Sequence, residues 1–94
     1  IDNKPKGDEN KNVVKRWGAQ INYYHGYFYQ AEGIFNLDAE KFDEALILFN
    51  QANEAFQNGL KEAVEARDEG LKSLLEKSLA EAKGYIGMCK TVLD

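Results

Sequence analysis

The two side chains of this sequence that most often perform chemistry in proteins are those of His25 and Cys89, its single histidine and single cysteine. A metal centre of the ordinary kind needs several His, Cys or carboxylate ligands that converge, and the Glu-x-x-His pairs of di-iron helical proteins do not occur here. Cys89 falls on an apolar helix face, where a buried thiol acts as a small hydrophobe with a high pKa. The sequence therefore predicts no enzyme, and neither a metal nor a cofactor.

Glycine and aromatic residues, which can bind phosphates and bases, are spaced here in other ways. Gly18, Gly26 and Gly33 follow helix faces and do not form the compact loop that holds a phosphate. The aromatic run from Tyr23 to Tyr29 could stack on bases, but no basic residues surround it. The net charge is −4. Nucleic acid requires a basic face, so we expect no nucleic-acid partner.

Composition indicates one small helical domain. The 94 residues contain a single proline, Pro5, and long segments rich in Ala, Leu, Glu, Lys and Gln. Because no run of eighteen apolar residues occurs, we expect no membrane span, and the polar opening residues do not resemble a signal peptide. One cysteine cannot form an internal disulfide, which fits a reducing compartment. We therefore expect a cytoplasmic protein.

Hydrophobic periodicity divides the chain into a flexible leader and three helices. The leader is predicted at residues 1–12 and the helices at about residues 13–38, 41–66 and 70–93. Asp68, in the second turn, is a candidate cap for the third helix; the alternative is that the last two helices continue as one rod. Short turns place successive helices antiparallel. The predicted fold is therefore all-α, an up-down-up three-helix bundle.

The first helix carries two apolar faces, so it should be buried on more than one side. We assign the larger face to the core of the bundle; its members are Val14, Trp17, Ile21, Tyr24, Phe28, Ala31 and Phe35. The second face lies roughly 160° around the helix. The alternative for this second face is that its small residues and tyrosines tolerate water. We expect it to bind a partner through Tyr23, Gly26, Gln30, Gly33 and Leu37.

The other two helices each show one core face. That of the second helix comprises Phe42, Ala45, Phe49, Ala52, Phe56 and Ala63, and that of the third comprises Leu71, Leu75, Ser78, Ala82, Tyr85, Cys89 and Val92. Small residues lie opposite the core face of the third helix. A helical glycine costs about 1 kcal/mol against alanine, so these positions indicate either close approach of a partner or a deliberately weakened helix. The expected second partner surface is Ala80, Gly84 and Gly87.

The segment KFDEALILFNQA, Lys41 to Ala52, resembles the second helix of a tetratricopeptide-like hairpin. The aromatic and alanine positions of that family are matched by Phe42, Ala45, Phe49 and Ala52. A single hairpin followed by one more helix is similar to the microtubule-interacting and transport (MIT) domain of endosomal-sorting proteins, and the long first helix is similar to a stretch of the Bro-type adaptors. These resemblances imply a protein-binding module in membrane trafficking.

The leading interpretation is a non-enzymatic module that binds an amphipathic helix or a neighbouring helical domain. The alternative is structural: the extra apolar faces are buried permanently, either inside a larger helical array or in a homo-oligomer. Size-exclusion chromatography with light scattering separates the two, because a transient partner site leaves a monomer. In the first case, replacing Gly84 and Gly87 by leucine should abolish binding without unfolding the chain.

Overall fold

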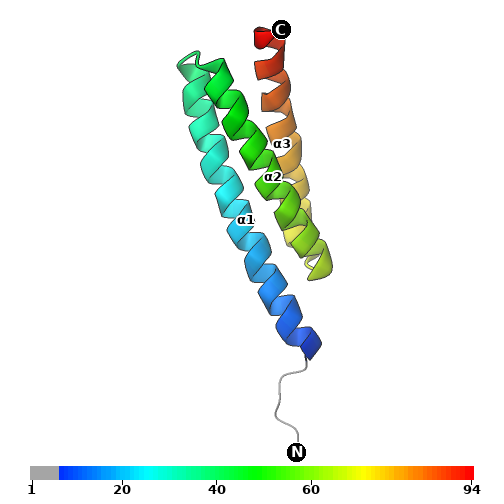
Figure 1. The fold of residues 1–94 in the computed structure, drawn as a ribbon. Coiled ribbons are helices and arrows are strands. Elements are labelled where there is room, and N and C mark those ends of the chain that lie inside the picture. Colours follow the sequence, from blue (N-terminus) through cyan, green and yellow to red (C-terminus); the bar gives the residue numbers. More distant parts are fainter. Residues whose placement is uncertain (1–6) are drawn as a thin grey trace, which may run out of the picture.

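The computed structural model describes the backbone of residues 7–94 and the side chains of residues 11–94 (Figure 1). Its helices are α1 (Gly7–Asp38), α2 (Phe42–Glu65) and α3 (Glu69–Leu93), which run up, down and up. The predicted all-α three-helix bundle is confirmed. The predicted leader is wrong for residues 7–12, which belong to α1, and residues 1–6 lie outside the described part. None of the described helices is both long and apolar enough to cross a membrane.

Both turns end the preceding helix with a residue in the left-handed region, Glu40 (φ 61°) after α1 and Arg67 (φ 57°) after α2. In the first turn the N–H of Lys41 donates to the C=O of Asn36, and the N–H of Glu40 donates to the C=O of Leu37. The second turn repeats both bonds. This is the Schellman motif, which usually has glycine at the left-handed position.

The second turn also confirms the predicted break between the last two helices. The carboxylate of Asp68 accepts a hydrogen bond from the N–H of Leu71 at 3.0 Å, so Asp68 caps α3 as expected. The same side chain binds Arg16 of α1, with Nε of Arg16 3.2 Å from Oδ2. Asp68 therefore both caps the start of α3 and links α1 to the second turn through its ion pair with Arg16.

Helix α2 lies at the centre of the bundle. It packs against both neighbours along its length, whereas α1 and α3 meet over a short stretch (Figure 1). Its predicted core positions are confirmed except at the first, since Phe42 is only partly buried and the others are fully buried: Ala45, Phe49, Ala52, Phe56 and Ala63. Because α2 covers only one side of α1, much of the α1 surface has no neighbour among the described residues.

Phenylalanine rings of α2 pack directly against glycines of α1. A Cβ added to Gly33 would lie 2.6 Å from Cε1 of Phe49, and one added to Gly26 would overlap the ring of Phe56. Both pairs are spaced by seven residues, so the rings sit two helical turns apart along the interface. The glycines let the two helices approach closely while the rings remain buried. This fit fixes which face of α1 meets α2.

Helix α3 covers another side of α2. Its predicted core residues Leu75, Ser78, Ala82 and Cys89 are buried, while Val92, near the helix end, is exposed. The hydroxyl of Ser78 donates to the C=O of Leu74 at 3.0 Å, which satisfies this buried polar group. The ring of Tyr85 stacks on Phe49, with centroids 4.8 Å apart and planes 9° from parallel. Phe49 is therefore held between a glycine of α1 and a tyrosine of α3.

The assignment of the two α1 faces from sequence is wrong, because the structure reverses it. The larger apolar face, expected in the core, is exposed at Val14, Trp17, Ile21, Tyr24, Phe28, Ala31 and Phe35. The glycine-containing face, expected to bind a partner, is the one that meets α2. The physical reason is shape: two glycines admit two buried rings, whereas a row of large aromatic side chains would hold the helices apart.

Candidate functional site

The five α1 residues predicted to bind a partner do not form a free surface. Gly26, Gln30 and Gly33 are buried in this chain's own interface. Tyr23 and Leu37 are partly buried and pack against the core. A partner could reach these residues only by displacing α2, so the prediction of a binding site here is wrong.

Gln30 is the most deeply buried polar side chain of α1 among the described residues. It exposes 3% of its surface, and its Oε1 atom has no hydrogen-bond partner within the described part of the chain. A buried acceptor without a partner costs about 1–3 kcal/mol. Asn53 of α2 also carries a buried side-chain oxygen without a partner among the described residues.

Tyr23 lies at the boundary between the core and the short contact of α1 with α3. Burial raises its pKa to about 12, and a hydrogen bond with Tyr27 and the nearby charge of Glu81 on α3 act in the same direction. The rings of Tyr23 and Tyr27 meet edge to face with centroids 4.8 Å apart, and both contact Phe56. A phenol held neutral in this way serves packing and is a poor proton donor at neutral pH.

The predicted surface on α3 is accessible. Ala80, Gly84 and Gly87 are exposed, and a Cβ added at either glycine would meet nothing within 4 Å. A shallow hollow of about 280 Å³ lies beside it, lined by Glu81, Gly84, Tyr85 and Met88. Whether a partner uses this surface stays a prediction.

A more extensive apolar surface runs along α1. We use the name outer stripe for its large side chains, which are 57–75% exposed: Val14, Trp17, Ile21, Tyr24, Phe28 and Phe35. Together with Ala31 they follow the alternating three- and four-residue spacing of a coiled-coil seam. Single exposed apolar residues are ordinary on protein surfaces, whereas a continuous run of them is uncommon on a monomeric protein.

Charge is nearly absent around the outer stripe. Residues 17–31 contain no Lys, Arg, Asp or Glu, although such residues make up 30% of the chain. The cores of protein interfaces are likewise depleted in charge and rich in aromatic side chains. The outer stripe therefore has the composition of an interface. The exposed side of α2, in contrast, is mostly polar.

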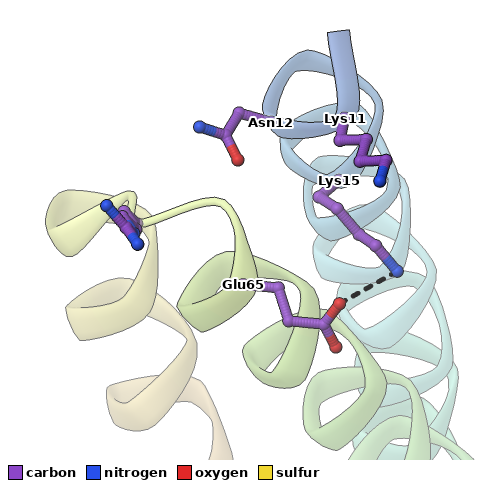
Figure 2. Close-up of a pocket in the computed structure, with 5 residues that line it drawn as sticks. Lys11, Asn12, Lys15 and Glu65 are labelled. Atoms are coloured by element: carbon purple, nitrogen blue, oxygen red, sulfur yellow. Dashed lines mark ion pairs between the residues drawn. The ribbon is translucent and has the colours of Figure 1, made fainter. Parts of the chain in front are cut away.

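The hollow drawn in Figure 2 is a poor candidate for a catalytic site. It encloses about 330 Å³ where α1 passes the turn between α2 and α3, and it is lined by Lys11, Asn12, Lys15, Glu65 and Arg67. Its lining is polar, and Nζ of Lys15 lies 3.0 Å from Oε2 of Glu65. This ion pair joins α1 to the end of α2, so its role is explained by the fold.

Cys89 and His25, the two residues with the most versatile side-chain chemistry, differ in burial and lie on different helices. Cys89 is fully buried beside Ala45 and Phe49, and this burial raises the pKa of its thiol. That confirms the expectation of a buried thiol with a high pKa. His25 is exposed on α1. Among the described residues, no group of three or more His, Cys, Asp and Glu side chains is placed to hold a metal ion.

A signal for the correct α1 face was present in the sequence. Phe42, Phe49 and Phe56 recur every seven residues on α2, and Ala19, Gly26 and Gly33 recur every seven on α1. In the antiparallel hairpin these two series place Gly26 against Phe56 and Gly33 against Phe49, small against large. Hydrophobicity alone ranks the other face of α1 higher, and for this reason the face assignment failed.

Comparison of the chain with protein-family models, with curated proteins and with solved structures gives no match. The resemblance to tetratricopeptide-like hairpins, MIT domains and Bro-type adaptors therefore stays a prediction, as does the trafficking role that it implies.

Proposed function

We propose that this chain is a non-enzymatic protein-interaction module that binds a helix of its partner along the outer stripe of α1. The observation that carries the proposal is the exposure of six large apolar side chains in one continuous row. From Val14 to Phe35 the row extends over about 32 Å of helix.

Heptad spacing favours a helix as the partner. Side chains that alternate at three and four residues fit between those of another helix that carries the same spacing. Helix-in-groove recognition uses anchors at these positions. The rigid rings of Trp17, Tyr24 and Phe28 are suitable anchors, because aromatic side chains contribute most strongly to binding at protein interfaces.

Photo-crosslinking tests the proposal directly. A benzophenone amino acid replaces Tyr24 within the outer stripe, and a second variant carries the probe at Ile47. Ile47 is an equally suitable control because it is 60% exposed on the polar side of α2. We expect illumination in extracts of the source cells to give a protein crosslink from position 24 and none from position 47.

A second comparison of variants distinguishes binding at the outer stripe from binding at the accessible surface on α3. Ile21→Glu should abolish the crosslink from position 24, whereas Gly84→Leu combined with Gly87→Leu should leave it intact. The opposite result would assign binding to α3, as the sequence predicted. Absence of any protein crosslink from position 24 would contradict the proposed function.

A further inference from the structure

We infer that the partner of the outer stripe is a second copy of this chain, and that the two α1 helices form an antiparallel, two-fold symmetric coiled coil. This inference rests on the proposed function and names its partner. It is drawn from the spacing, area, charge and position of the outer stripe.

Spacing supplies the first argument. A coiled-coil seam needs an equally long seam on the partner helix, and the outer stripe is the longest exposed apolar row among the described residues. On α2, Ile47 and Val64 are isolated from each other. An α1–α1 contact is also closed by symmetry, because each copy uses the same surface.

The exposed area supplies the second argument. Trp17, Tyr24, Phe28 and Phe35 are 61–75% exposed. Since a full aromatic residue presents about 200 Å², these four expose roughly 500 Å² of the about 800 Å² that each partner contributes to a standard interface. The aliphatic members and the flanks of the stripe supply the remainder, so two copies can form a stable dimer.

Charge supplies the third argument and sets the orientation. Lys11 and Glu32 occupy equivalent heptad positions beside the outer stripe, three heptads apart and both exposed, and Lys11 also borders the hollow of Figure 2. An antiparallel arrangement brings Lys11 beside the partner's Glu32 at both ends of the interface. It also places opposite ends of the two helix dipoles together, while the uncharged middle of the stripe introduces no repulsion.

The register follows from these constraints. Val14 faces the partner's Ala31, and Trp17 faces the partner's Phe28. Ile21 faces the partner's Tyr24 across the two-fold axis. The fold leaves room for this approach, because α2 packs on the face of Gly26 and Gly33 and the stripe residues stay exposed.

The oligomeric state tests the inference with a matched pair of variants. Ile21 (57% exposed, in the stripe) and Ile47 (60% exposed, outside it) are each replaced by glutamate. In sedimentation equilibrium we expect the parent chain and Ile47→Glu at twice the 10.6 kDa chain mass. Ile21→Glu should weaken self-association by at least about 100-fold, because the substitution enters a symmetric interface twice. Circular dichroism should show all three chains equally helical.

Failure of this inference is distinct from failure of the proposed function. A parent chain that stays monomeric near 100 µM overturns the dimer; if the position-24 probe still captures a different protein, helix binding itself stands. If the probe at position 24 captures no protein at all, both the dimer and the proposed function are contradicted.

Disulfide crosslinking tests the orientation. A mixture of Val14→Cys and Ala31→Cys chains should form a mixed disulfide on mild oxidation, while the parent chain, whose Cys89 is buried, should not crosslink. Efficient linkage of Val14→Cys to itself would show parallel helices and overturn the antiparallel arrangement.

Discussion

At the scale of single residues, glycine has two opposite roles in this chain. Gly26 and Gly33 leave room for buried phenylalanine rings, so their lack of a side chain is required by packing. Gly84 and Gly87 face open space, where a side chain would meet nothing. The sequence treats all four as helical glycines, and only their surroundings separate them.

Alanine substitution should therefore have opposite effects at two of these glycines. Gly33→Ala should lower the free energy of unfolding by about 1–3 kcal/mol, because the buried ring of Phe49 cannot move away. Gly84→Ala should raise it by up to about 1 kcal/mol through helix propensity. Chemical denaturation of both variants measures this, and equal effects at the two sites would contradict the packing described here.

The raised pKa of Tyr23 predicts a dependence of stability on alkaline pH. Between its ordinary pKa of 10.0 and about 12, the unfolded chain loses the phenolic proton and the folded chain keeps it. Stability from this group is therefore fully present below pH 10 and falls as the pH rises toward 12. In denaturation curves at pH 8 to 11.5, Tyr23→Phe should lose less stability than the parent chain. A parallel loss in both would show that Tyr23 is not responsible.

At the scale of helices and turns, Asp68 connects all three elements. It ends the second turn, caps α3 through Leu71 and binds Arg16 of α1. Both turns also use a non-glycine residue in the left-handed region, Glu40 and Arg67. These turns depend on backbone hydrogen bonds and on Asp68 more than on glycine.

Two substitutions at Asp68 should separate its roles. Asp68→Ala removes both the cap and the ion pair and should lower the free energy of unfolding by about 1–2 kcal/mol. Asp68→Asn retains a good capping side chain, so most of this loss should be restored, since a partly exposed ion pair contributes only about 0–1 kcal/mol. Thermal unfolding compares the two variants; an equal loss in both would assign the effect to the contact with Arg16.

At the scale of the whole molecule, α2 and α3 together leave a large part of the described α1 surface uncovered. Helix α2 packs against α1 on the glycine face, and α3 touches α1 only briefly. The outer stripe therefore remains open along most of α1. A second copy would convert this surface into a second core.

Association of this kind should appear in thermal unfolding. For a dimer, the melting temperature rises with protein concentration because binding stabilises the folded state. Over a 100-fold range of concentration we expect an increase of several degrees for a chain of this size. Ile21→Glu should melt at a temperature independent of concentration, and the same behaviour in the parent chain would argue against association.

The sequence by itself determined the three helices, the position of both turns, the cap at Asp68 and the core faces of α2 and α3. Those features depend on periodicity and on local hydrogen bonding, and both are determined by residues that are close together in the sequence. The sequence also showed that α1 has more apolar surface than one neighbour covers. Its buried thiol at Cys89 followed from the same heptad pattern.

Only the tertiary structure decided which face of α1 is inside. Both faces are apolar, and burial of hydrophobic area alone would favour the aromatic face. The choice depends on shape across two helices: Phe49 and Phe56 fit over Gly33 and Gly26, whereas the other face of α1 carries a row of large side chains. Complementarity between residues distant in sequence therefore placed the glycines in the core and left the outer stripe as the candidate binding surface.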